Sequence, residues 1–349
     1  MKKRIFLFFG ALCFFVSCTK SQNLNELLKS FEKENEAMGT VSILKNGNNF
    51  YEKSIGYANI ELDKKNNAET KFRIGSISKT FTATIILQLL DEGKLSLKNS
   101  LSQYFPEIPN SENITISDML YHRSGIYNIT TDKNFEVWIS EPRSRNEMIT
   151  KIKSKASLFK PNSKLEYSNS NYILLAYIAE NIDKKTFGEI VNHRIIDKLN
   201  LKRTDFGKDI DFSKNEAMCY YPENGKWHPI TFHTNLTGTM GAGGVISNAK
   251  EVSVFYNALF TGKLISKESL KLMTTPKEEM GMGISVNEFN DLVVYGHDGA
   301  IDGFRSIAAY MPKLKLTICF TFNASSGSHS QKLLKIFKAY KYTITQKSN

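Results

Sequence analysis

The chain has 349 residues, of which 41% are hydrophobic and 23% are charged, and its formal net charge is +11. This length is ample for a sizeable hydrophobic core in one large or two ordinary domains. The lysines are scattered singly, without an arginine-rich run or a basic stripe interleaved with aromatic residues. We therefore expect a solvated basic surface and no nucleic-acid partner.

The first residues have the pattern of an export signal. Met1 to Arg4 are basic after the initiator, and residues 5–16 are nearly all apolar but too few for a comfortable membrane span. A small residue and then Cys18 end this run, which resembles the cleavage box of a lipoprotein signal peptidase. We expect residues 1–17 to be a lipoprotein signal peptide and Cys18 to be lipidated. Ordinary signal cleavage is the alternative, because Phe15 departs from the leucine usual at its position.

This pattern predicts an exported lipoprotein, anchored in a membrane on its periplasmic or cell-envelope side. Of the four cysteines, Cys13 lies in the signal and Cys18 at its end. Cys219 and Cys319 both have apolar or aromatic neighbours, so we expect two buried free thiols rather than a disulfide. No metal-ligand spacing is present, and we expect neither a metal nor a cofactor.

The region before residue 76 mixes a helix with strands. Residues 24–38 carry apolar side chains at the helical period. Two β-like runs follow, residues 40–44 and 49–55, around an Asn-Gly hairpin signal. Residues 71–74 are a candidate third strand.

The middle of the chain favours helices. Residues 80–90 are rich in apolar side chains, and Gly93 suits the end of a helix there. Helix-like stretches then alternate with turns as far as residue 235, and the expected helices are residues 115–120, 172–182 and 187–199.

The last third changes character again. Three strands are expected, at residues 291–295, 307–311 and 316–322. Breaks between them are expected at residues 296–303 and at Pro312-Lys313, and residues 331–341 predict a closing amphipathic helix.

Strands near both ends and helices between them predict an α+β protein with two lobes. Residues 24–75 and 236–345 would form an antiparallel sheet flanked by helices. Residues 76–235 would form a mainly helical second lobe. Ligands commonly bind in the cleft between two such lobes.

Ser76 is the candidate nucleophile. It follows a β-like run and a glycine, and it opens a helix-like run in which Lys79 lies one turn later on the same face. A desolvated lysine amine can activate a serine, and a helix N-terminus offers N–H groups to an oxyanion. The Ser-x-x-Lys spacing alone is weak evidence. It recurs at Ser17, Ser30, Ser42, Ser157 and Ser247.

Tyr167 and Asn169 are candidate partners, and they precede the helix expected from residue 172. A tyrosine phenol can relay a proton, and an asparagine amide can hold a substrate carbonyl or a lysine amine. The alternative is structural, with Tyr167 as an aromatic at the helix entry and Asn169 as its N-cap.

A second candidate segment contains His297, Gly299 and Ala300. The glycine permits close approach of a backbone or a substrate. The amide of Ala300 is then a second oxyanion donor beside the amide of Ser76. The alternative is a structural histidine at a turn, and we assign no role to the other histidines, His122 among them.

Three short motifs follow one another along the chain: Ser76-x-x-Lys79, Tyr167-x-Asn169 and His297-x-Gly299. In this order they resemble the serine β-lactamase / penicillin-binding-protein superfamily, and most of all its class C β-lactamases, D-alanyl-D-alanine carboxypeptidases and related esterases. Matching context includes residues 72–81, 116–126 and 242–247, and the resemblance covers about residues 25–345. It implies a β-lactamase-like fold.

The resemblance also implies roles. Ser76 would be the acylated nucleophile, Lys79 its general base and Tyr167 the residue that passes a proton to the leaving group. Asn169 would position Lys79 and the substrate amide. The protein would be an exported serine hydrolase that acts through an acyl-enzyme on D-Ala-D-Ala-type peptides, β-lactams or small esters.

His297 would contact the hydroxyl network and the substrate carboxylate, with Gly299 beside it, and the amides of Ser76 and Ala300 would form the oxyanion hole. Many members of the superfamily have lysine at the position of His297. Lysine is a permanent cation, whereas histidine is mostly neutral at pH 7, so the departure bears on β-lactam hydrolysis more than on acyl transfer. The alternative function is a catalytically silent, penicillin-binding-like protein of the envelope.

Overall fold

The computed structural model describes residues 22–207, 209–289 and 291–348, so the predicted signal peptide and Cys18 lie outside the described residues. Its central element is a six-stranded antiparallel sheet in the order β10-β11-β12-β13-β1-β2. Both ends of the described chain contribute strands to this sheet, as predicted. The strands are β1 (Ala37–Lys45), β2 (Asn48–Ile55), β10 (Ser285–Phe289), β11 (Leu292–Ile301), β12 (Phe304–Met311) and β13 (Leu316–Ser325).

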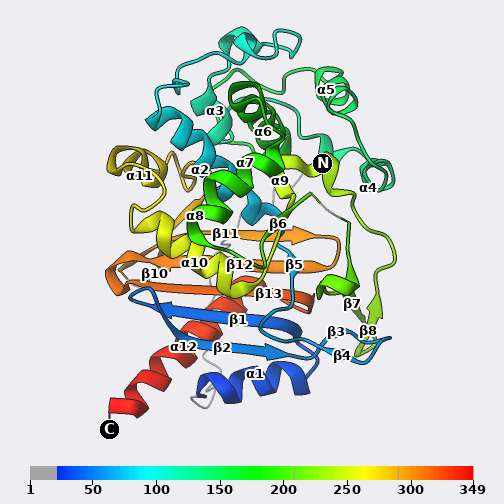
Figure 1. The fold of residues 1–349 in the computed structure, drawn as a ribbon, viewed down its shortest axis with the longest axis vertical. Helices are drawn as coiled ribbons and strands as arrows, with labels where there is room; N and C mark the ends of the chain where they lie inside the picture. Colours follow the sequence, from blue (N-terminus) through cyan, green and yellow to red (C-terminus); the bar gives the residue numbers. More distant parts are fainter. Residues whose placement is uncertain (1–21, 208, 290, 349) are drawn as a thin grey trace.

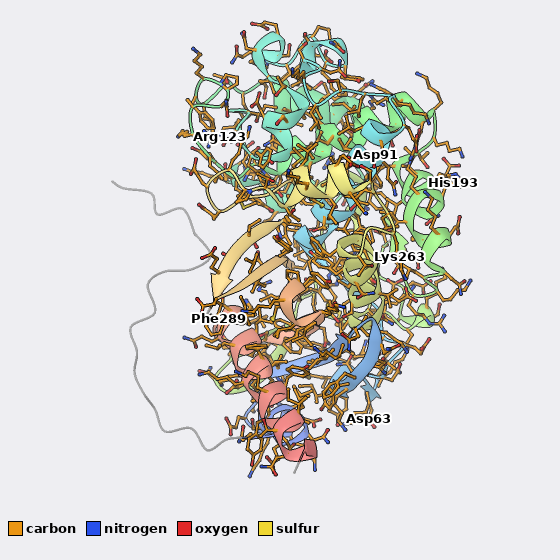
Figure 2. All side chains as sticks on the ribbon, turned by 90° about the vertical axis from the view of Figure 1, so that its left-hand side faces the viewer. Asp63, Asp91, Arg123, His193, Lys263 and Phe289 are labelled. Atoms are coloured by element: carbon orange, nitrogen blue, oxygen red, sulfur yellow. The ribbon has the colours of Figure 1, made fainter. Side chains whose placement is uncertain are left out.

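Helices cover both faces of the sheet. On one face, α1 (Leu24–Lys33) and α12 (His329–Ser348) bury apolar side chains against β1, β12 and β13. On the other face lies α10 (Ala249–Phe260). Viewed from the side, α12 runs beside the β10–β11 hairpin, where the ring of Phe289 packs edge-on against Phe337 (Figure 2). Because it is covered on both sides, β1 is buried over almost its whole length.

The first helix is shorter than predicted. We expected residues 24–38 to be helical, but α1 ends at Lys33 and β1 begins at Ala37. Asn35 adopts a left-handed backbone with φ +50°, which ends a helix, and the amide of Glu36 bonds to the carbonyl of Phe31. The apolar residues after this turn belong to the sheet, which the helical period alone does not reveal.

The predicted helices of the middle region gather at one end of the molecule, and the sheet with α1 and α12 lies at the other (Figure 1). The central helices α2 (Ser78–Asp91) and α6 (Asn169–Asp183) correspond to the predicted helices 80–90 and 172–182. Both are buried on nearly every side, as is expected of helices that carry apolar residues all round. Around them lie α3 (Ile116–Leu120), α4 (Phe135–Ile139), α5 (Arg145–Lys153), α7 (Phe187–Val191), α8 (Asp197–Leu199), α9 (Leu236–Gly243) and α11 (Lys267–Thr274). A π-helical turn, Asn192–Ile196, joins α7 to α8.

Small sheets connect the two parts. The candidate third strand is present as β5 (Phe72–Arg73), but it pairs with β9 (Val245–Ser247) rather than with the large sheet. β6 (Asp205–Phe206) lies on the other edge of β9. Two further hairpins are β3 (Tyr57–Asn59) with β4 (Lys64–Lys65) and β7 (Tyr220–Glu223) with β8 (Lys226–Pro229). β5 leads directly into the segment that carries Ser76.

The expected break at residues 296–303 is wrong. β11 continues through His297, Gly299 and Ala300 to Ile301, and the chain turns only at residues 302–303. The glycines in this stretch indicate close backbone approach instead of a turn, because a Cβ at Gly299 would overlap the carbonyl oxygen of Ile74.

Among the residues that the structure describes, no helix combines the length and the apolar character that a membrane span requires. Cys219 and Cys319 are buried free thiols.

Candidate active site

The three predicted motifs meet at the junction of the two parts of the molecule. Ser76 lies on a 3₁₀ turn (Gly75–Ile77) that runs straight into α2, which carries Lys79. Tyr167 lies just before α6, and Asn169 is the first residue of that helix. The third motif lies on β11.

Ser76 and Lys79 form a hydrogen-bonded pair. The Lys79 Nζ lies 3.0 Å from the Ser76 Oγ. The hydroxyl of Ser30, in another Ser-x-x-Lys match, bonds instead to the carbonyl of Leu27 on α1. The fold thus distinguishes Ser76 from a serine that the spacing alone could not tell apart from it.

The Lys79 amine has two further partners, and both can only accept hydrogen bonds. They are the Asn169 Oδ1 at 2.7 Å and the carbonyl oxygen of Ala242, on α9, at 2.8 Å. A neutral amine has two hydrogens and one lone pair. Because the two oxygens take both hydrogens, the lone pair is left to face the hydroxyl of Ser76.

The surroundings of Lys79 favour this neutral form. Its side chain is completely buried, and burial lowers the pKa of the amine to about 7, against a smaller opposing effect from the carboxylate of Asp298. A lysine with such a pKa is neutral in a substantial fraction of molecules near neutral pH, as a general base must be.

Tyr167 is placed as a proton donor to the nucleophile. Its hydroxyl lies 3.0 Å from the Ser76 Oγ. Burial raises the pKa of the phenol above its ordinary value, and the hydrogen bond to Ser76 only partly opposes this. Tyr167 is therefore protonated at neutral pH and can give a proton, whereas a phenolate base is disfavoured.

Asn169 is locked in the orientation that serves Lys79. Its Nδ2 donates to the Thr130 Oγ1 at 3.0 Å and lies 3.4 Å from the Asn128 Oδ1, so its oxygen must face the amine. Its side chain does not cap α6, because Ser168 occupies the cap position. Asn128 and Thr130 were not predicted. They lie at a 3₁₀ turn (Ile129–Thr131, capped by Asn128), and the approach of this turn to α6 has no signal in residue spacing.

His297 points toward Tyr167, with 6.4 Å between the ring centroids. Its Nδ1 lies 2.6 Å from the carbonyl oxygen of Asp298, so Nδ1 carries the proton and Nε2 is a free acceptor. Within the described residues, Nε2 is buried and has no hydrogen-bond partner. Burial lowers the pKa of the imidazole and favours its neutral form. Its contact with the hydroxyl network stays a prediction.

The predicted oxyanion donors lie on two backbones in close contact. A Cβ at Gly75 would lie 2.8 Å from the amide nitrogen of Ala300, so only glycine lets β11 pass so near to Ser76. The hydroxyl of Ser306, on β12, donates to the carbonyl of Ile74 at 2.8 Å and fixes the same contact. The amide of Ala300 is thereby held beside the nucleophile segment.

One contact of the site was missed altogether. The ring of His122, to which the sequence assigned no role, stacks on the ring of Tyr167 with 4.2 Å between centroids. His122 belongs to a stretch that matches the superfamily, but neither its spacing nor its residue type indicated this contact.

In the part of the chain that the structure describes, no group of three or more His, Cys, Asp or Glu residues could hold a metal ion.

Comparison with known proteins agrees with this geometry. The family model described as Beta-lactamase matches residues 24–341. The chain belongs to the Beta-lactamase family. The chain is 29% identical over 325 residues to "Putative penicillin-binding protein PbpX" of Bacillus subtilis strain 168. This alignment covers 91% of the chain and 79% of that protein. A second relative, Protein flp of Staphylococcus aureus strain MRSA252, is 27% identical over 82% of the chain. The chain spans about three fifths (59%) of the length of that relative.

Solved structures show the β-lactamase-like fold of this family member. The D-amino acid amidase of Ochrobactrum anthropi SV3 superposes with a TM-score of 0.81 at 21% identity, over 92% of this chain and 99% of that one. A D-stereospecific amidohydrolase of a Streptomyces species superposes with a TM-score of 0.76 at 25% identity, over 89% and 96% of the two chains. The predicted α+β fold class is confirmed.

The burial of Lys79 predicts how acylation depends on pH. The rate constant should rise as pH increases through about 7, because only the unprotonated amine can accept the proton of Ser76. The measurement is the rate of labelling by a neutral fluorophosphonate probe between about pH 5 and about pH 9. A rate that is flat over this range, or that falls as pH rises, would contradict the role of Lys79.

Proposed function

We propose that the protein is a serine hydrolase that forms an acyl-enzyme at Ser76 and acts on amide or ester substrates. The observation that carries this proposal is the position of the Lys79 amine, which lies 3.0 Å from the Ser76 Oγ and donates to two oxygens that can only accept, those of Asn169 and Ala242. Family membership supports the same chemistry.

Acylation follows from this geometry. The Lys79 amine takes the proton of Ser76 as Oγ attacks the substrate carbonyl carbon, and negative charge develops on the carbonyl oxygen. The amides of Ser76 and Ala300 would stabilise that charge. As the carbon–nitrogen or carbon–oxygen bond breaks, Tyr167 gives its proton to the leaving group, and the proton held by Lys79 restores the phenol.

Hydrolysis of the acyl-enzyme repeats these steps with water in place of the leaving group. A water molecule attacks the ester carbonyl, and either a neutral Lys79 or a Tyr167 phenolate accepts its proton and then passes that proton to the departing Ser76 Oγ. Since the raised pKa of Tyr167 disfavours the phenolate, Lys79 is the base that this site supports better.

The substrate class follows in part from His297. A neutral imidazole with an accepting Nε2 suits a substrate N–H or O–H better than a carboxylate, which needs a cation. The two structural neighbours are named as a D-amino acid amidase and a D-stereospecific amidohydrolase. D-configured amides, which lack that carboxylate, are therefore our first candidates, with D-Ala-D-Ala-type peptides, β-lactams and small esters next.

A labelling experiment tests the proposal. The wild type should be labelled by a fluorophosphonate or by fluorescent penicillin and should turn over at least one of a D-amino acid amide, a D-Ala-D-Ala peptide, a β-lactam and a p-nitrophenyl ester. Ser76→Ala should abolish labelling and turnover, because the attacking oxygen is gone. Ser30→Ala is the matched control, since it removes a serine with the same lysine spacing on α1, and it should change neither.

The opposite result would favour the alternative function. If the folded wild type is neither labelled nor active on any of these substrates, the hydrolase proposal fails. Binding of penicillin without covalent labelling would then support the catalytically silent envelope protein.

We also propose that the protein is exported and anchored in a membrane through a lipid on Cys18. The basic start, the apolar run and the small residue before Cys18 support this. Cys18→Ala should abolish incorporation of a labelled fatty acid in a bacterial host and release the protein from the membrane fraction. Cys13→Ala, inside the signal, should leave both unchanged. Exported wild-type protein without lipid would contradict the anchor and favour ordinary cleavage.

A further inference from the structure

His122 adopts a backbone conformation that few residues other than glycine accept readily. It follows α3 directly after the helix cap at Tyr121, and its φ is +55°. Glycine is the usual residue at such a left-handed position after a helix, and asparagine and histidine are among the few others that are enriched there. The backbone therefore limits which side chains position 122 can carry.

His122 contacts three consecutive residues of another segment, residues 166–168. The carbonyl oxygen of His122 accepts the amide N–H of Glu166 at 2.9 Å. Its Nδ1 accepts the amide N–H of Ser168 at 3.1 Å. Between these two bonds, its ring stacks on Tyr167 at 4.2 Å with 27° between the planes.

The held segment has no regular secondary structure of its own. Residues 164–168 lie between a turn and the start of α6. The phenol of Tyr167 must nevertheless stay 3.0 Å from the Ser76 Oγ. Two backbone bonds and a stacked ring are the restraints that His122 supplies to that position.

The chemistry of the imidazole fits a fixed, neutral support. Both groups at its Nδ1 are donors, the amide of Ser168 and the Asn171 Nδ2 at 3.4 Å, so Nδ1 is unprotonated. Burial holds the pKa of His122 well below its ordinary value, and Lys79 and His297 lower it further whenever they are protonated. His122 is completely buried, so it cannot touch substrate from solvent.

We propose that His122 is a positioning residue, which holds the phenol of Tyr167 against Ser76 through a clamp on residues 166–168. The inference rests on the proposed hydrolase function, in which Tyr167 transfers a proton. It assigns a catalytic consequence to a histidine that takes no part in the chemical steps.

His122→Asn is the informative substitution. Asparagine accepts a left-handed backbone and can place an oxygen near the position of Nδ1, so it keeps the bond to Ser168 and removes the stacked ring. We expect acylation to fall on the order of 10-fold to 100-fold, the scale for a displaced catalytic group. His193→Asn is the control. His193 is exposed on the π-helical turn after α7 (Figure 2), and acylation should be unchanged.

A double-mutant cycle separates positioning from a general structural effect. The four proteins are the wild type, His122→Asn, Tyr167→Phe and the double variant, each assayed by fluorophosphonate labelling well below its unfolding temperature. If His122 acts through the phenol, its substitution should cost little or nothing once that phenol is absent. If His122→Asn does not fold, the same four-protein comparison is made with His122→Gln in its place.

Each outcome has a distinct meaning. Loss of acylation in His122→Asn that disappears in the Tyr167→Phe background supports the clamp. An equal fractional loss in both backgrounds, or no loss in either, overturns it while leaving the hydrolase proposal intact. A folded wild type that no probe labels overturns the hydrolase proposal and the inference together.

Discussion

The burial of one amine organises the site. The Lys79 Nζ is removed from water and surrounded by the oxygens of Ser76, Asn169 and Ala242. An isolated buried ammonium is strongly unfavourable, so the amine loses affinity for its proton, and its pKa falls to about 7. The three oxygens come from the turn before α2, from α6 and from α9. The packing of these elements around one nitrogen would give Ser76 a base.

A second set of contacts brings the sheet to this centre. Glycine at positions 75 and 299 lets the backbones of the nucleophile segment and β11 approach too closely for any side chain, and the bond from Ser306 to Ile74 holds them there. The amide of Ala300 and the ring of His297 are thereby carried to the site by the large sheet. The amide of Ala300 and the ring of His297 thus lie on the large sheet, whereas the amide of Ser76 and the proposed proton-transfer groups lie on the helical part, and the fold brings them together.

Much of this could be predicted from the sequence, and the misses have physical causes. The spacings around Ser76, Lys79, Tyr167 and Asn169 predict that these side chains meet, and the structure brings them together. The carbonyl of Ala242 was not predicted, because a backbone acceptor has no residue type. Asn128, Thr130 and His122 lie on segments whose approach depends on tertiary packing. The strand through His297 was read as a turn because glycine marks turns and close approaches alike. The helix from residue 24 was drawn too long because the apolar residues after its end belong to β1.

The central claim is that the fold makes Lys79 a neutral base, and its titration tests this most directly. Side-chain NMR of protein labelled with ¹³C and ¹⁵N in lysine follows each amine separately, and the loss of one signal in Lys79→Ala assigns it. We predict a midpoint of about 7 for this signal, well below the ordinary range of a lysine amine. A Lys79 signal that titrates in that ordinary range would contradict the account.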